Sequence, residues 1–268
     1  MLALTSVSDM MRISNAPGVV KANRELHAVG LGAMNLHGYL AKNRIAYDSA
    51  EARDFARTFF MMMNFYSLEK SMEIARERGE TFQGFERSEY AKGTYFEKYL
   101  ETDYRPRSDK VRRLFDGIPI PTPDDWRALK EKVQTYGLYH AYRLAIAPTQ
   151  SISYIQNATS SVMPIVEPIE TRTYANSTTY YPMPFLSKDN LFYYKSAYNM
   201  DQFDVIDLIA EIQEHIDQGI STVLHVRSDI STRELARYYI YAAKKGLKAL
   251  YYTRTKRVEV SECVSCAV

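Results

Sequence analysis

The last third of the chain alternates between two hydrophobic periods, and this alternation limits the possible folds more than any other feature of the sequence. The pattern predicts four elements in turn: a helix over 205–216, a strand over 221–226, a helix over 231–246 and a strand over 247–253. Gly219 and Gly246 are suited to end the two helices, and Ser231 with Glu234 forms a capping-box pattern at the start of the second. Helices that alternate with strands predict an α/β fold in which the strands pack under the helices.

The first hundred residues predict mainly helix, because apolar side chains recur at three- and four-residue steps. One such stripe, which we expect to form the buried face of its helix, comprises Phe55, Phe59, Met62, Met63 and Tyr66. A further helix is expected to begin at Thr122-Pro123-Asp124-Asp125 and to end near Gly137. Residues 148–187 are rich in Ser, Thr, Pro and Tyr, and predict a loop, one short helix and then extended chain.

Composition and charge exclude several classes of protein. The 268 residues carry a formal net charge of +2, which gives no electrostatic case for binding nucleic acid or an anionic membrane. No apolar run approaches the length of about 20 residues that spans a bilayer, and the first residues lack the pattern of a signal peptide. The chain has two cysteines, so we expect a reducing, cytoplasmic setting rather than a secreted disulfide scaffold.

The two cysteines form the sharpest local motif, Cys263-Val264-Ser265-Cys266, in a tail from Arg257 that we expect to be mobile. A Cys-x-x-Cys pair closes a small disulfide or supplies half of a zinc site. Zinc would need two more ligands, and the nearest histidine is His225. The pattern favours a dithiol on a flexible arm that exchanges with another disulfide, and the alternative is a chance pair without a role.

Two other motifs have both a functional and a structural interpretation. Residues 148–153, Pro-Thr-Gln-Ser-Ile-Ser, precede the expected short helix, where hydroxyl and backbone N–H groups either hold a phosphate or simply cap the helix. Tyr251-Tyr252 is one of several tyrosine pairs, and ordinary packing is the alternative to a special role for any of them.

Glycines and histidines near residue 30 predict structural roles. Gly30 and Gly32 begin like a dinucleotide-binding fingerprint, but Asn35 stands where the third glycine belongs and no strand precedes the motif. We therefore expect these glycines to allow close helix packing. His27 and His37 are ten residues apart, which is not metal-ligand spacing within one helix, and we expect both to be structural.

Three segments together resemble the large, substrate-binding subunit of class I ribonucleotide reductases, most closely the class Ib form. The first continues directly into the 148–153 loop and comprises Trp126, Leu129, Gly137-Leu138-Tyr139-His140, Leu144-Ala145 and Pro148. The second is Lys248-Ala249-Leu250-Tyr251-Tyr252, and the third is the terminal Cys-x-x-Cys. The resemblance covers essentially the whole chain. It implies the second part of a ten-stranded α/β barrel plus a small C-terminal α/β region over 1–256, and a flexible redox tail over 257–268.

The resemblance also implies a reaction, the reduction of ribonucleoside diphosphates to deoxyribonucleoside diphosphates for DNA synthesis. Tyr251 and Tyr252 match a stacked pair that relays a radical, and Cys263 with Cys266 matches a dithiol that re-reduces the active-site disulfide and is itself reduced by a redoxin. No cofactor is expected to bind the chain directly, because a small dimanganese or diiron subunit supplies the radical. The positions that match the loop holding the substrate diphosphate are Pro148, Thr149, Gln150, Ser151 and Ile152.

The sequence departs from the family in one large respect. The family abstracts a hydrogen atom with a cysteine in an Asn-x-Cys-x-Glu pattern and uses two further cysteines as a redox pair, and the sequence contains none of the three. We therefore expect a fragment, from a split or interrupted gene or a truncated gene model, that is inactive alone and needs an upstream fragment of the large subunit as a partner. Nucleotide effectors are expected to bind mainly upstream. The rival interpretations are a non-catalytic module that docks a radical subunit or a complementary large-subunit fragment, and a free dithiol oxidoreductase.

Overall fold

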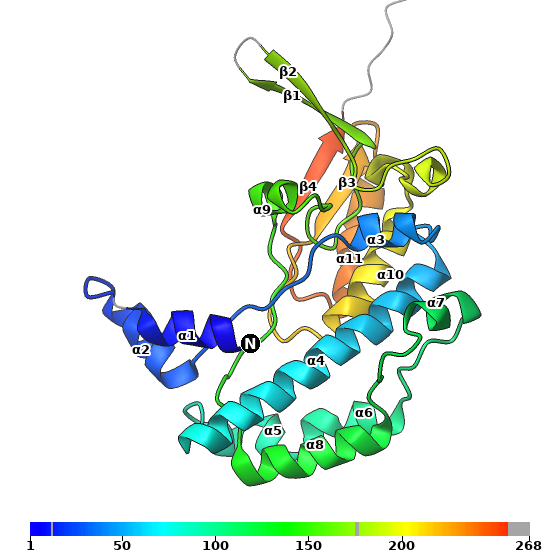
Figure 1. The fold of residues 1–268 in the computed structure, drawn as a ribbon. Coiled ribbons are helices and arrows are strands. Elements are labelled where there is room, and N and C mark those ends of the chain that lie inside the picture. The colour runs from blue at the N-terminus through cyan, green and yellow to red at the C-terminus, as the bar shows by residue number, and fades with distance from the viewer. Residues whose placement is uncertain (12, 175–176, 257–268) are drawn as a thin grey trace, which may run out of the picture.

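The computed structural model describes residues 1–11, 13–174 and 177–256 (Figure 1). Its α-helices are α1 (Leu2–Met10), α2 (Pro17–Leu26), α3 (Leu36–Lys42), α4 (Ala50–Arg78), α5 (Glu89–Lys92), α6 (Glu97–Glu101), α7 (Asp109–Leu114), α8 (Pro123–Tyr136), α9 (Gln150–Ile155), α10 (Gln202–Gln213) and α11 (Thr232–Lys244). The strands are β1 (Ile169–Tyr174), β2 (Ser177–Pro182), β3 (Val223–Arg227) and β4 (Tyr252–Lys256), and short 3-10 helices lie at Phe85–Arg87, Thr94–Phe96, Leu191–Tyr193 and Ala197–Asn199. Within the described ranges, no helix combines the length and the apolar character needed to span a bilayer.

Helix α4 contributes to two apolar cores along its length. Its first half packs with α3 and α10, where Phe55, Ala56 and Phe60 meet Val205 and Ile209. Its second half packs with α6 and α8, and the members of that core include Met61, Phe65, Leu68, Met72, Tyr99, Trp126, Leu129 and Val133. In Figure 1, α4 accordingly runs obliquely from the α10 side of the molecule down to α5 and α8.

The predicted helix over residues 55–66 is confirmed, but its predicted buried face is wrong in part. Phe55 is buried, whereas Phe59 and Tyr66 are exposed. Polar residues, Asn64 and Ser67 among them, take the buried face instead, because a buried arginine from another segment bonds to both. Hydrophobic periodicity cannot identify a buried face that is partly polar.

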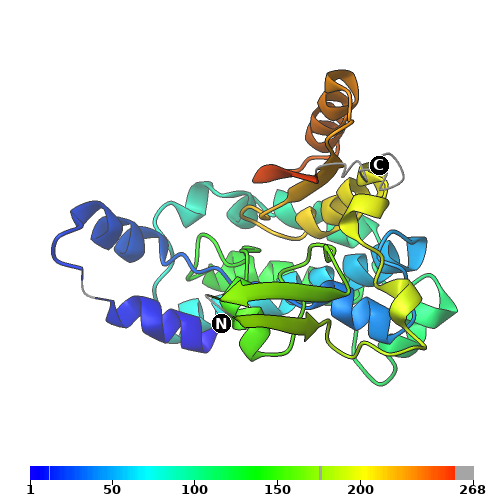
Figure 2. The ribbon, with the colours of Figure 1, turned by 90° about the horizontal axis from the view of Figure 1, so that it is seen from above.

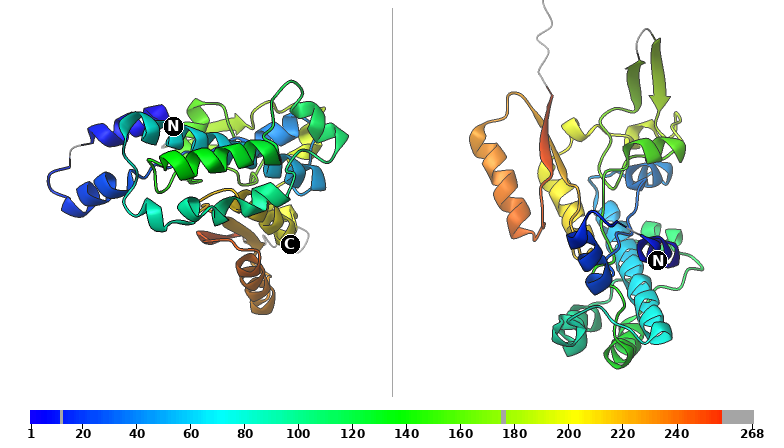
Figure 3. Two further views of the ribbon diagram at one scale, coloured as in Figure 1. Left: turned by 90° about the horizontal axis from the view of Figure 1, so that it is seen from below. Right: turned by 90° about the vertical axis from the view of Figure 1, so that its left-hand side faces the viewer.

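The predicted α/β arrangement of the last third is confirmed. β3 and β4 pair in parallel, with α11 as the connection between them. An isolated parallel bridge, Ile146↔Ile220, joins a further extended segment to the chain just before β3, and a second bridge, Leu31↔Leu144, joins the segment at Leu31 to that one. The described residues form no closed barrel. Figures 2 and 3 show α11 on the outer side of β3 and β4, and the right-hand view of Figure 3 shows the antiparallel β1–β2 hairpin as a separate projection.

Two predicted boundaries in this region are wrong. Helix α10 ends at Gln213 rather than near Gly219, because the chain turns there to bring the Asp217 carboxylate to backbone N–H groups of residues 143 and 144. Strand β4 begins at Tyr252 rather than at residue 247. The preceding residues form a connection, in which the Lys248 ammonium donates to the backbone carbonyls of Ile216 and Asp217. Both turns are fixed by contacts between distant segments.

The helix limits with clear capping signals agree with the sequence. Thr122 caps α8 in a capping box with Asp125, and Gly137 follows its last residue. The Ser231 side chain accepts a hydrogen bond from the Glu234 backbone N–H at the start of α11. The loop, short helix and extended chain predicted over 148–187 correspond to α9 and the hairpin.

The predicted role of Gly30 and Gly32 in helix packing is wrong, because both lie in extended chain. A Cβ atom on Gly32 would stand 2.6 Å from the carbonyl oxygen of Ala145, and one on Gly30 would stand 3.3 Å from the Ala145 Cβ. The glycines therefore allow two extended segments to approach, where Leu31 bridges Leu144.

The structural interpretation of the two histidines is confirmed. His37 is fully buried, its Nδ1 accepts from the Ile165 backbone N–H, and its Nε2 lies 3.0 Å from the Tyr193 carbonyl oxygen. His27 stacks on Tyr139 and lies 3.4 Å from a Glu80 carboxylate oxygen. Among the described residues, no group of three or more histidine, cysteine or acidic side chains is arranged to hold a metal ion.

Buried histidines predict that the fold weakens in mild acid. Burial lowers the pKa of His37 to about 4 and that of His140 to about 3, whereas a histidine in the unfolded chain titrates near 6.5. Because the unfolded state takes up protons first, this stability is fully present above pH ~6.5 and is lost as the pH falls toward the folded pKa values. We expect the free energy of unfolding to fall by about 2 kcal/mol per buried histidine between pH 7 and pH 5.

Urea denaturation at pH 7, 6 and 5 measures this loss. As the matched variant, His37→Gln keeps a polar side chain but removes one titrating group, so its free energy of unfolding should depend less on pH. A wild-type unfolding free energy that stays constant over this range would contradict the prediction.

Candidate functional site

One cavity of about 550 Å³ brings together two segments that are a hundred residues apart in the sequence. Its wall includes Pro148, Gln150 and Ser151 at the start of α9, and Tyr251 and Tyr252 at the start of β4. The base of the hairpin and β3 complete the wall, and Figure 1 shows α9 and β4 at the same level of the molecule below the hairpin. The sequence singled out both segments, but it gave no distance between them.

The remaining loop residues lie outside this wall. The Thr149 hydroxyl accepts from the Ser161 backbone N–H at 2.7 Å and lies 3.5 Å from the Ser160 hydroxyl. The Thr149 side chain makes no hydrogen bond that caps α9, so the alternative role of helix capping does not apply to this residue. Ile152 is exposed and is not part of the cavity wall. Thr149 therefore joins the loop to the segment that follows α9.

Tyr251 and Tyr252 contact each other through their rings, with centroids 5.0 Å apart and planes tilted by 59°. Two residues inside a regular strand point to opposite faces, but Tyr251 precedes β4 and its N–H donates to the Thr222 carbonyl oxygen. Both side chains remain substantially exposed, at 62% and 46%.

Other tyrosine pairs serve packing. Tyr194 is buried and its hydroxyl donates to the Pro184 carbonyl oxygen. Tyr238 is buried and its hydroxyl donates to the Glu234 carboxylate at 3.2 Å. The packing interpretation thus holds for these two tyrosines, and the exposed pair at the cavity differs from them.

Charged residues that the sequence analysis missed also line the cavity. Arg254 is the one lysine or arginine among its lining residues in the described chain, and Glu170 is the one acid. Burial raises the pKa of Glu170, and the nearby Arg254 guanidinium partly offsets this effect. The Tyr154 hydroxyl donates to the Glu170 carboxylate at 3.2 Å. A strand period of two places Arg254 on the same face as Tyr252, which is the signal that could have found it.

Cys263 and Cys266 lie outside the described residues. A second cavity, of about 630 Å³, lies among α1, α2 and the end of α4 and includes His27, Arg78 and Tyr139 in its wall. None of the predicted site residues lines it.

Comparison with known proteins gives the family. The family model described as "Ribonucleotide reductase, barrel domain" matches residues 1–253. This chain belongs to that family.

Relatives of this family are similar over nearly the whole chain. The chain is 57% identical over 266 residues to "Ribonucleoside-diphosphate reductase subunit alpha" of Bacillus subtilis, covering 99% of this chain and 38% of the relative. Identity is 38% over 287 residues to the protein of the same name from Mycoplasma pneumoniae, covering 100% of the chain and 40% of that relative. Identity is 32% over 267 residues to the protein of the same name from Treponema pallidum, covering 99% of this chain and 29% of that relative. The predicted membership of the ribonucleotide reductase family is therefore confirmed, and the chain spans about two fifths or less of these relatives.

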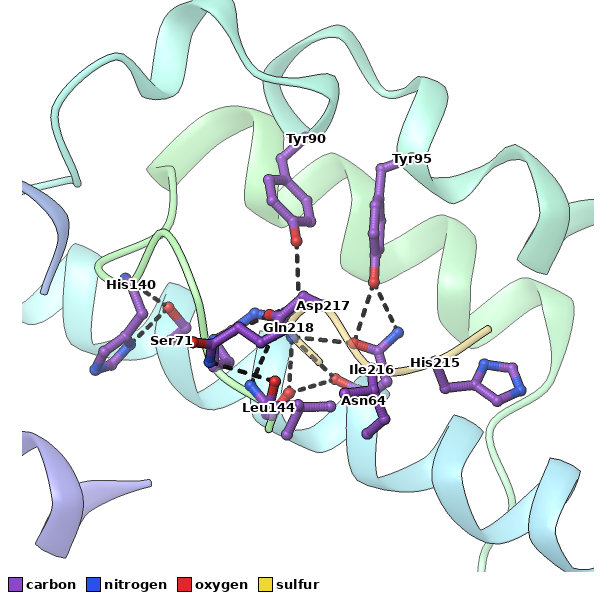
Figure 4. A network of polar contacts seen from close by, with 12 residues as sticks. Asn64, Ser71, Tyr90, Tyr95, His140, Leu144, His215, Ile216, Asp217 and Gln218 are labelled. Carbon is purple, nitrogen blue, oxygen red and sulfur yellow. Dashed lines mark hydrogen bonds and ion pairs between the residues drawn. The ribbon is translucent and has the colours of Figure 1, made fainter. Parts of the chain in front are cut away.

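A buried ion pair fixes the chain that leads into the cavity wall of this family member (Figure 4). Asp217 precedes β3, and its carboxylate lies 3.1 Å from the guanidinium of Arg143, which is fully buried. The same carboxylate accepts from the backbone N–H groups of Arg143 and Leu144 at 2.9 and 2.8 Å. The turn before β3 is thereby attached to the extended segment that runs toward α9.

The Arg143 guanidinium also binds two helices. It donates to Asn64 Oδ1 at 3.0 Å and to Ser67 Oγ at 2.7 Å on α4, and to the Tyr90 hydroxyl at 3.1 Å on α5. Burial alone disfavours the charged guanidinium, but Tyr90 and Asp217 outweigh it and hold the pKa of Arg143 above its ordinary value. The charge is therefore kept in the core.

Neutralising Asp217 should strongly destabilise the protein. Asp217→Asn leaves the Arg143 charge buried without its counter-ion, and breaking a buried pair in this way costs about 3–5 kcal/mol. Asp229→Asn is the matched control, because Asp229 pairs with Arg227 at 3.9 Å on the surface, where a pair contributes about 0–1 kcal/mol. The measurement is the free energy of unfolding in urea, and equal stability of the two variants would refute the role given to the buried pair.

Proposed function

We propose that this chain takes part in reducing ribonucleoside diphosphates to deoxyribonucleoside diphosphates, as one part of a larger catalytic unit. The observation that carries the proposal is the shared cavity, since the loop at 148–151 and the tyrosine pair line the same wall. The name that these relatives share, ribonucleoside-diphosphate reductase subunit alpha, supplies the reaction and the substrate class.

The loop is the proposed binding site for the substrate diphosphate. Its backbone N–H groups and the Ser151 hydroxyl are neutral donors, and Arg254 adds a positive charge across the cavity. Pro148, Thr149 and Ile152 belong to the same loop, with Thr149 shaping it through its bond to the Ser161 backbone. Binding energy at the phosphates holds the sugar in place for reaction at a distance from the loop.

Tyr251 and Tyr252 are the proposed radical relay. A small dimetal subunit supplies the radical, which passes through the two phenols toward the sugar. Ring contact suits transfer between the two residues, and their exposure leaves them open to a partner subunit. Because the sequence has no cysteine besides Cys263 and Cys266, the cysteine that abstracts the substrate hydrogen has to come from a further part of the large subunit. Effector nucleotides are expected on that further part.

Cys263 and Cys266 are the proposed source of electrons. Removing the 2′-hydroxyl as water consumes two electrons and two protons, and a dithiol releases both on becoming a disulfide. In this scheme an active-site disulfide receives them by thiol–disulfide exchange, and a redoxin then reduces the tail. The rival proposal is a non-catalytic module that docks the radical subunit or the complementary part of the large subunit.

Tyrosine-to-phenylalanine variants distinguish a relay from a docking surface. In an assay with CDP, a radical subunit, the complementary large-subunit fragment and dithiothreitol, Tyr251→Phe and Tyr252→Phe should each lose nearly all turnover. Phenylalanine keeps the ring but forms no phenoxyl radical, and loss of one hydroxyl costs only about 0.5–1.5 kcal/mol of stability. Tyr239→Phe is the control, because Tyr239 is similarly exposed and its hydroxyl bonds to Thr253.

Full turnover by the Tyr251 and Tyr252 variants would favour the docking module. The chain without the complementary fragment should show no turnover, and turnover by the chain alone would refute its place in a larger unit.

Replacing both cysteines by serine separates the tail from the fold. We expect unchanged stability, normal single turnover and no repeated turnover with a redoxin as reductant, because in this proposal the dithiol carries the electrons and forms no part of the core. Urea denaturation and redoxin-coupled assays measure the two effects. Normal cycling of the double variant would show that the tail is not the electron donor.

A further inference from the structure

Two polar atoms on the wall of the cavity are buried and have no hydrogen-bond partner among the described residues. They are the hydroxyl oxygen of Ser161 and Nδ1 of His225. Ser161 is 3% exposed and His225 is 5% exposed, yet both line the cavity. Buried polar atoms are normally paired, so two unpaired ones on the same cavity wall are candidates for hydrogen bonds to a ligand.

Ser161 is held in place by the phosphate loop. Its backbone N–H donates to the Thr149 hydroxyl at 2.7 Å, and its φ is +54°, in the left-handed region that residues other than glycine seldom adopt. This bond fixes the backbone of Ser161 and leaves its side chain for another partner. The orphan hydroxyl thus belongs to a residue already attached to the loop.

His225 is held from the other side of the cavity. Its backbone N–H donates to the Gln202 side-chain oxygen at 2.9 Å, and its ring packs edge-on against Tyr198, with centroids 5.2 Å apart. Burial and the nearby Arg254 guanidinium lower the pKa of His225 to about 4, against a smaller opposite effect of the Val223 backbone, so the ring is neutral at neutral pH. A neutral imidazole makes one donated and one accepted hydrogen bond, and it carries no charge to attract a phosphate.

The register of the two parallel strands locates His225 relative to the tyrosine pair. Val223 pairs with Tyr252, and His225 pairs with Arg254, one step further along the same face. His225 therefore lies directly beside the arginine that we assign to the diphosphate, and diagonally from the tyrosine that we assign to the relay. A ligand bound to both would lie near His225.

We propose that Ser161 and His225 hydrogen-bond the nucleoside part of a bound nucleoside diphosphate and fix it relative to Tyr251 and Tyr252. The inference rests on the proposed function and adds two substrate-contacting residues to it. Nucleoside hydroxyl and ring nitrogen groups are neutral donors and acceptors, so they match a serine hydroxyl and a neutral imidazole. The diphosphate is left to the loop and Arg254.

Calorimetric titration of the full 268-residue chain with CDP and, separately, with inorganic pyrophosphate tests the division between the two ends of the ligand. Ser161→Ala and His225→Phe should each weaken CDP binding about tenfold, the loss of one hydrogen bond, and change pyrophosphate binding less than twofold. Arg254→Gln should weaken binding of both compounds. His225→Asn, whose amide reaches the position of Nδ1, should restore most of the CDP affinity.

The fold is checked by thermal unfolding of every variant, and Ser161→Gly provides a second test because glycine accepts a positive φ without strain. It should lose CDP affinity as Ser161→Ala does. If the Ser161 and His225 variants bind CDP as tightly as the wild type does, the inference is overturned and the proposed function still stands. A parallel loss of pyrophosphate binding would overturn it too. A wild-type chain that binds pyrophosphate but not CDP overturns the nucleoside contacts alone, and one that binds neither overturns the proposed substrate site as well.

Discussion

Arg143 lies in the core with no exposed surface, and the segments that form the cavity wall are connected through its guanidinium and its backbone. The guanidinium contacts α4 and α5, and its backbone N–H is bound by Asp217 in the turn before β3. A buried ion pair does not by itself stabilise a fold more than apolar residues of the same volume would. Its contribution here is geometric, because a guanidinium with donors in fixed directions accepts only one arrangement of α4, the 143–146 segment and the turn.

That arrangement determines what the cavity contains. Asp217 fixes the chain six residues before the start of β3, and the parallel pairing with β4 then places Tyr252, Arg254 and His225 on one face. The segment that begins at Arg143 leads in the other direction into Pro148 and α9. The two sides of the cavity therefore begin at the same ion pair, so the distance between the 148–151 loop and the tyrosine pair depends on contacts in the core.

Local signals in the sequence predicted much of the fold, and the failures share one cause. Caps such as Thr122 and Ser231 were identified correctly, because a helix start depends on the residues next to it. The start of β4 and the end of α10 depend instead on Lys248 and Asp217, which bond to segments far away in the chain. The prediction that Phe59 lies in the core fails for the same reason. Asn64 is buried on α4 instead, because it bonds to Arg143, which lies 79 residues away in the sequence.

The candidate site was predicted from the sequence only as separate motifs. Pro148, Gln150 and Ser151 were identified with the tyrosine pair through a family pattern, but their common cavity follows from the tertiary structure. Ser161, His225 and Arg254 had no local signal: a serine in a loop, a histidine in an apolar strand and an arginine near a tail are all common. Ser161 and His225 are identified by burial without a partner, and Arg254 by strand register, which are properties of the folded chain.

The position of β4 also bears on how one chain could supply both a radical path and electrons. Lys256 ends β4, on the strand whose first residue lines the cavity, and Cys263 follows seven residues later. A chain of that length spans at most about 25 Å when fully extended. A covalent connection of that length keeps Cys263 within that distance of the end of β4, and in the proposed function this raises the effective concentration of the dithiol near the cavity. Strand β4 therefore serves the proposed function twice, by carrying Tyr252 at its start and by anchoring the redox tail at its end.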